Sequence, residues 1–139
     1  MRDQLKERCG KIEECYEFML AYAAQGLRTE PGGGGASQLR SLLTRGDEAL
    51  DGLGELFTAI VRAEKLQPAE KYDAFIAMLT RDASDARAAI GLVLAQPSIS
   101  SQLIDNLNAS IHLRALLTDL FLIDEIVRPD ATVNIAHVE

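Results

Sequence analysis

The sequence predicts an all-α fold: an up-down-up-down antiparallel four-helix bundle with a glycine-rich loop between the first two helices and a short C-terminal tail. Apolar residues recur at spacings of three and four along four long segments, and Gly or Pro residues separate these segments. Two of the connections are short, which makes the second, third and fourth segments antiparallel neighbours. With 139 residues, of which 47% are hydrophobic, the chain can bury one core, and we place a single domain at residues 1–128 and the tail at 129–139.

The first helix is expected at residues 2–25, because its apolar residues form a heptad seam and Gly26 supplies a C-terminal stop. The seam alternates spacings of four and three through Leu5, Cys9, Ile12, Tyr16, Met19 and Ala23. A second, shorter apolar stripe of the same helix comprises Cys15, Phe18 and Tyr22. Residues 27–36 follow, and their Pro and run of glycines predict a flexible loop.

The second helix is expected at residues 37–66, with Ser37 as its N-cap. Gly46 lies on the apolar stripe of this helix, which predicts the close approach of a neighbouring helix. Gly52 points away from that stripe, and it is expected only to weaken the helix.

The third helix is expected at residues 68–95, with Pro68 in its first turn. The middle of its apolar stripe is thin because it is made of Ala83 and Ala86, so an opposing bulky side chain must fill that layer. The fourth helix is expected at residues 100–128, where Pro129 stops it. The candidates for its N-terminal cap are Ser98, Ser100 and Ser101.

The second half of the fourth helix, residues 115–127, carries apolar residues around its whole circumference. A helix that is apolar all round has to be buried all round, so this run is expected to contact its own bundle on one side and a second chain on the other. Together with the shorter stripe of the first helix, it supplies the candidate interface of a symmetric homodimer. Its members are Cys15, Phe18, Tyr22, Leu116, Leu120, Leu122, Ile123 and Ile126. The alternative is that a slightly irregular bundle buries both patches internally.

Composition and charge exclude several classes of partner. The net charge of -7 and the pI of about 4.8 make this an acidic chain, and duplex nucleic acid and anionic membrane surfaces are poor partners for it. The N-terminus is charged from its second residue, and no window holds the ~18 uninterrupted apolar residues of a membrane span. Cys9 and Cys15 lie on different sides of one helix and cannot bridge each other, so a soluble protein in the reduced cytoplasm is expected.

A polar notch is expected on the fourth helix, where Arg114 falls on the apolar stripe and Asn106 and Ser110 flank the same side. The arginine either extends outward or meets an acidic residue of a facing helix. Binding of a small anion is the third possibility.

His112 is the one histidine inside the expected bundle, and it is expected to be exposed. Its segment, IHLRALL, resembles over three or four positions the phosphoacceptor segment of phosphotransfer four-helix domains, which implies a phosphorelay role for His112. The small residues of that family are replaced here by Leu116 and Leu117. No Glu-x-x-His pair is present, and the pair of Asn108 and His112 does not make a metal site by itself.

No spacing of Ser, His and Asp suggests a catalytic triad, so catalysis is not expected. The expected function is that of a non-catalytic helical bundle without a cofactor that acts through protein–protein interaction, as an adaptor, assembly or chaperone-like homodimer. The alternatives are phosphorelay through His112, and small-molecule binding in a pocket near Ala83, Ala86 and Arg114. The tail from Val133 to Val138 is a further place where a partner or a twin chain can dock.

Overall fold

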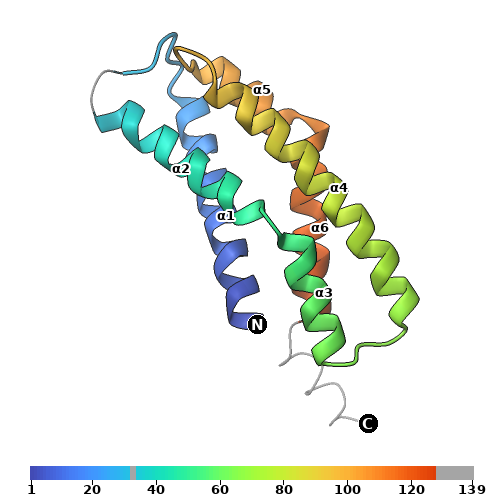
Figure 1. Ribbon diagram of the computed structural model, residues 1–139. Helices are drawn as coiled ribbons and strands as arrows, with labels where there is room; N and C mark the ends of the chain where they lie inside the picture. The colour runs from blue at the N-terminus through green and yellow to red at the C-terminus, as the bar shows by residue number, and fades with distance from the viewer. Residues whose placement is uncertain (32–33, 128–139) are drawn as a thin grey trace.

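The computed structural model describes residues 1–31 and 34–127, with residues 34–37 described by their backbone only. The described residues form helices and no strand, which confirms the all-α prediction (Figure 1). The predicted number of four helices is wrong, because these residues form six. They are α1 (Arg2–Ala24), α2 (Gly34–Leu50), α3 (Leu53–Ala63), α4 (Ala69–Leu94), α5 (Ser101–Ala109) and α6 (Ile111–Val127). The tail, with Val133 and Val138, lies outside the described residues.

The predicted helix at 37–66 is divided into α2 and α3 at Gly52. Gly52 has a φ of 70°, in the left-handed region that glycine enters without the steric cost of a Cβ atom. Its expected role as a mere weak point in a continuous helix is therefore wrong. Arg8 of α1 donates a hydrogen bond to the Asp51 carbonyl at this break. α2 also begins at Gly34, so part of the expected glycine-rich loop is helical.

The predicted helix at 100–128 is likewise divided, into α5 and α6, at Ser110. The backbone of Ser110 is extended, and its Oγ accepts a hydrogen bond from the Leu113 N–H (3.3 Å), which caps α6. Ser100, one of the three candidate caps, does cap α5, because its Oγ accepts from the Leu103 N–H (3.0 Å). Residues before and after Ser110 consequently do not share the faces that one continuous helix would give them.

α1 and α4 are the two long uninterrupted helices, and the four shorter helices pack against them (Figure 1). α1 packs against α2 and α5, and α4 packs against α2, α3 and α6. Every helix contributes buried apolar side chains to one continuous cluster. Phe57 of α3 is fully buried, and its ring makes edge-to-face contacts with Tyr72 and Phe75 of α4 at centroid distances of 6.2 and 6.3 Å.

Gly46 lies at a close approach of α1 to α2, which confirms the predicted approach of a neighbouring helix. A Cβ atom at this position would lie 2.9 Å from the Cys15 Sγ atom and 3.1 Å from the Cys15 Cβ atom. Both residues are buried, and the Cys15 Cβ atom is fixed to the backbone of α1. Any side chain at residue 46 therefore pushes the two helices apart.

Gly46→Ala is expected to lower the free energy of unfolding by about 1–2 kcal/mol, because overpacking outweighs the gain of about 1 kcal/mol in helix propensity. Gly91→Ala is the matched control, since Gly91 is helical and exposed, and a Cβ atom added there would have nothing within 4 Å. That control is expected to raise stability by about 0.5–1 kcal/mol. Urea unfolding followed by circular dichroism measures both changes. Equal stabilisation by the two substitutions would contradict close packing at Gly46.

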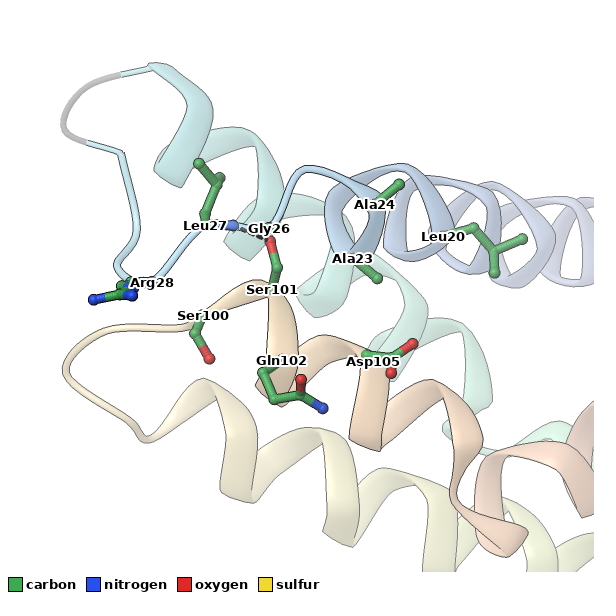
Figure 2. Close-up of a pocket in the computed structure, with 10 residues that line it drawn as sticks. All are labelled: Leu20, Ala23, Ala24, Gly26, Leu27, Arg28, Ser100, Ser101, Gln102 and Asp105. Carbon is green, nitrogen blue, oxygen red and sulfur yellow. Dashed lines mark hydrogen bonds between the residues drawn. The ribbon is translucent and has the colours of Figure 1, made fainter.

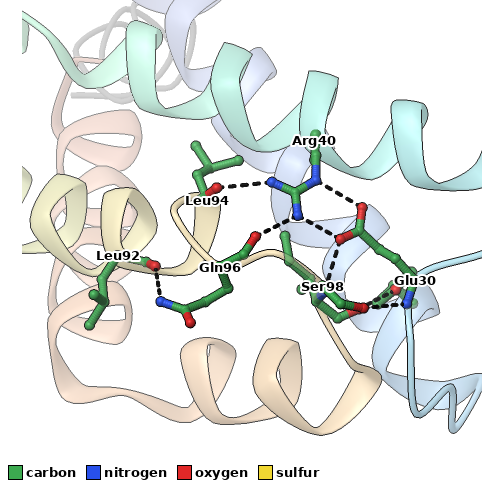
Figure 3. Close-up of polar contacts among 8 residues, drawn as sticks. Glu30, Arg40, Leu92, Leu94, Gln96 and Ser98 are labelled. Atoms are coloured by element: carbon green, nitrogen blue, oxygen red, sulfur yellow. Dashed lines mark hydrogen bonds and ion pairs between the residues drawn. The ribbon is translucent and has the colours of Figure 1, made fainter.

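A partly buried polar cluster joins the connection between α1 and α2 to the connection between α4 and α5 (Figure 3). Arg40 of α2 donates two hydrogen bonds to the Glu30 carboxylate (2.9 and 2.7 Å) and one each to the carbonyls of Leu94 (2.9 Å) and Gln96 (2.8 Å). Glu30 also accepts from the Ile99 N–H (2.9 Å), and its side chain is only 9% exposed. The hydrogen bonds from Arg40 hold the pKa of Glu30 below its usual value. We call this group the Glu30–Arg40 cluster.

Candidate interaction surface

The first half of the expected interface, on α1, is not a surface. Tyr22 and Cys15 are only 2% and 5% exposed, and Phe18 is partly buried. The Tyr22 hydroxyl donates to the Ile99 carbonyl (2.6 Å), while Gly46 of α2 lies against Cys15. The chain's own helices therefore cover this stripe, which corrects its assignment to a partner and matches the alternative of internal burial.

The second half of the expected interface divides into two faces of α6. Leu116, Leu120 and Ile123 are buried in the chain's own core, where they are unavailable to a partner. Leu122 and Ile126 are 47% and 55% exposed. The described residues therefore cover only the inner face of this helix, and the expected contact of its outer face with a second chain stays a prediction.

Two further apolar side chains of α6, Ile111 and Phe121, are 75% and 60% exposed. Exposed positions recur along the helix at spacings of three and four, so they form one surface. We call it the outer face of α6, and it comprises Ile111, Ala115, Thr118, Leu122 and Ile126, flanked by Arg114, Phe121 and Glu125. Of these residues, Ala115 alone is partly buried. Scattered single apolar side chains are ordinary on a surface, but a stripe along a whole helix is typical of an interface.

The expected polar notch is not assembled. The break at Ser110 places Asn106 on α5 and Arg114 on α6, and the Ser110 hydroxyl is engaged as the cap of α6. Asn106 is exposed and accepts a hydrogen bond from Gln102 (3.1 Å). Arg114 is exposed, as in the outward alternative.

His112 is exposed on the first turn of α6, as expected. Asn108, by contrast, is 8% exposed at the end of α5, and its Oδ1 atom has no hydrogen-bond partner among the described residues. The break at Ser110 separates the two side chains that a continuous helix would have placed on one face. Within residues 1–31 and 34–127 no group of three or more His, Cys, Asp or Glu side chains is placed to hold a metal ion.

A buried carboxyl group, Asp119 of α6, lies at the level of the alanine layer of α4. Ala83 and Ala86 are buried, and Asp119 is only 3% exposed, with the carboxylate of Asp82 as its charged neighbour and its own Oδ2 atom without a hydrogen-bond partner among the described residues. Burial raises the pKa of Asp119 to about 7, with a further contribution from Asp82. Asp119 was not predicted as a site residue, although its position three residues after Leu116 and four before Ile123 places it on the inner stripe.

An open groove of about 630 Å³ lies at the opposite end of the molecule, between the end of α1 and the start of α5 (Figure 2). Leu20, Arg28, Gln102 and Asp105 line it, together with Ser101. The Ser101 hydroxyl is already engaged, because it accepts from the Leu27 N–H and donates to the Tyr22 carbonyl (2.8 and 2.7 Å). Ala83 and Ala86, where a ligand pocket was an alternative, do not line this groove.

Neither cysteine is activated for nucleophilic chemistry. Burial raises the pKa of Cys9 and of Cys15 to about 11, and neighbouring carboxylates act in the same direction. Both thiols are therefore protonated at neutral pH.

None of the described helices combines the length and the apolar character that crossing a membrane requires. Comparison of the chain with protein-family models, with curated proteins and with solved structures gives no match.

Proposed function

We propose that this protein is a non-catalytic helical bundle that acts through protein–protein interaction, as an adaptor, assembly or chaperone-like protein, and that it forms a homodimer through the outer face of α6. The observation that carries the proposal is the exposure of four large apolar side chains along one helix: Ile111, Phe121, Leu122 and Ile126. Apolar surface removed from water stabilises an association by about 25 cal/mol per Å² before the entropic cost of binding. A second chain on this face would cover all four.

In this proposal each pair of consecutive short helices takes the place of one long, bent helix: α2 with α3, and α5 with α6. The chain then follows the up-down-up-down course of an antiparallel bundle. The protein works in the reduced cytoplasm without a cofactor. Its net charge of -7 disfavours nucleic acid and anionic membranes as partners. Phosphorelay through His112 is the alternative that the exposure of this histidine favours, although Leu116 and Leu117 stand where phosphotransfer domains carry small residues.

Leu122→Asp is expected to convert a dimer into a folded monomer, because a carboxylate at the centre of an apolar contact would lose its hydration on association. Sedimentation equilibrium measures the mass, and circular dichroism checks that the helix content is unchanged. Leu92→Asp is the matched control, since Leu92 is 68% exposed on α4 and lies outside the outer face of α6. The wild type and the Leu92 variant are expected to remain dimers. A monomeric wild type, or a dimeric Leu122 variant, would overturn the proposal.

A further inference from the structure

The outer face of α6 has a pattern that can pair with itself. Its central stripe runs through residues 111, 115, 118, 122 and 126, in which bulky side chains stand at both ends and small ones in between. The Thr118 hydroxyl donates to the Arg114 carbonyl of its own helix (2.9 Å). Covering Thr118 therefore leaves no buried hydroxyl without a partner.

A two-fold axis passing between residues 118 and 119 brings the stripe into register with an antiparallel copy of itself. Ile111 then lies opposite Ile126 of the second copy, and Ala115 lies opposite Leu122, because the members of each pair are equally far from the axis along the helix. Each contact occurs twice, as the symmetry requires. The small Ala115 leaves room for the bulky Leu122, which is how facing helices interdigitate.

The charges on one flank of the stripe favour the same arrangement. Arg114, Phe121 and Glu125 lie within about 40° of one another around α6, at about 100° per residue. In an antiparallel pair the same flanks of the two helices meet, which places Arg114 between Phe121 and Glu125 of the second copy. The guanidinium then lies about 3 Å along the axis from the register position of Glu125, at ~1.5 Å rise per residue, within the reach of both side chains. It can also stack on the Phe121 ring.

A parallel pairing would lose these contacts. It would bring each residue of the central stripe opposite its own copy, so that the bulky residues would collide in one layer. It would also place the charged flanks of the two helices on opposite sides of the contact, so that Arg114 would not meet Glu125 of the other copy. We infer that the partner of the outer face of α6 is the same face of a second copy, paired antiparallel about a two-fold axis beside Thr118, with Arg114 of each copy on Glu125 of the other. This inference rests on the proposed homodimer and specifies its register.

Charge reversal tests the contact between Arg114 and Glu125. Arg114→Glu and Glu125→Arg are each expected to raise the Kd of the dimer about tenfold or more, because each creates two pairs of like charges. The double variant restores opposite charges and is expected to return the Kd to within about threefold of the wild-type value. Arg28→Glu, an exposed charge at the other end of the molecule, is the control for net charge and is expected to leave the Kd unchanged. Absence of rescue in the double variant would overturn the pairing.

Disulfide cross-linking tests the direction and the axis. Thr118→Cys is expected to give a covalent dimer under mild oxidation, because its two copies lie beside the axis, within the Cα separation of about 4.4–6.8 Å that a disulfide spans. The two copies of an Ile111→Cys variant would lie about 22 Å apart along the helices, at ~1.5 Å per residue, and are expected not to cross-link. The wild type, with Cys9 and Cys15, serves as the blank.

The outcomes separate the two proposals. A monomeric wild type would remove the homodimer and this register together. A dimeric wild type in which Ile111→Cys cross-links, or in which Thr118→Cys does not, would overturn the antiparallel register while leaving the homodimer in place. A dimer insensitive to Arg114→Glu and to Glu125→Arg would likewise move the contact to another face.

Discussion

Replacing Arg40 with methionine is expected to lower the free energy of unfolding by about 3 kcal/mol, which is the lower end of the range for removing one partner of a buried ion pair. The loss is large because the Glu30 carboxylate is nearly buried and would remain without its bidentate partner. The carbonyls of Leu94 and Gln96 would lose their donor as well. The lower end applies because the Arg40 side chain is itself 33% exposed.

Thermal and urea unfolding would measure this effect, with Arg87→Met as the matched control. Arg87 makes a similar contact with Asp47 (3.0 Å), but both of these side chains are more exposed, so a change below about 1 kcal/mol is expected. The pair Glu30→Gln and Arg40→Met, combined, is expected to recover part of the stability, since no buried charge would remain. Equal losses in the Arg40 and Arg87 variants would show that burial of Glu30 contributes nothing.

The stability that the Glu30–Arg40 cluster gives to the folded chain is lost in acid. The folded-state pKa of Glu30 is lowered, chiefly by the hydrogen bonds from Arg40, so its carboxylate stabilises the folded chain at every pH above its unfolded value of about 4.3. That contribution is lost as the pH falls through the lowered folded-state pKa. The contribution of Glu30 to the free energy of unfolding is therefore constant near neutral pH and falls only in acid.

Asp119→Asn is expected to raise the free energy of unfolding at pH 8 by about 2–4 kcal/mol and to change it little near pH 4. The folded-state pKa of Asp119 is about 7, because of burial and then of Asp82, whereas the unfolded value is about 3.9. A raised pKa favours the folded state fully below the unfolded value, and this advantage disappears as the pH rises through about 7. Above that pH the wild type holds a buried carboxylate beside a second one.

The difference in unfolding free energy between the wild type and the variant, measured by urea titration at intervals from pH 4 to pH 8, isolates Asp119 and its effect on Asp82 from the other titrating groups. Within one turn of Asp119 on α6, residues 115, 116, 122 and 123 are all apolar, and one turn from Asp82 on α4 the charged residue is Asp85. Asp85 is exposed, and Asp85→Asn is the control, with an expected change within about 0.5 kcal/mol at both ends of the range. A difference that does not depend on pH would contradict the raised pKa.

Local patterns were sufficient to predict much of the fold. The apolar periodicity predicted the all-α class and, to within a residue or two, the bounds of α1 and α4, and Gly46 on its stripe indicated the close approach of a neighbouring helix. The breaks at Gly52 and Ser110 were not predicted. Glycine and serine are both tolerated within helices, and only the tertiary packing decides that Gly52 takes a positive φ and that Ser110 becomes a cap.

The candidate site was harder to predict, because periodicity shows which residues are apolar and does not show which helix covers them. Cys15 and Tyr22 look like a surplus stripe on α1, yet α2 and the start of α5 lie over them. The unpredicted break at Ser110 also rotates α6 relative to α5. This rotation is the reason that Arg114 is exposed where the stripe of a continuous helix would have buried it.

The two breaks also divide the molecule along its length into parts that can fluctuate separately. α2 and α5 pack on α1 at one end, while α3 and α6 pack on α4 at the other, and only α1 and α4 continue past a break. Opening of a local unit requires the loss of its own contacts and not of the whole core. Amide hydrogen exchange should therefore report two cooperative units, one at each end of the molecule. The two long helices, α1 and α4, extend through both units.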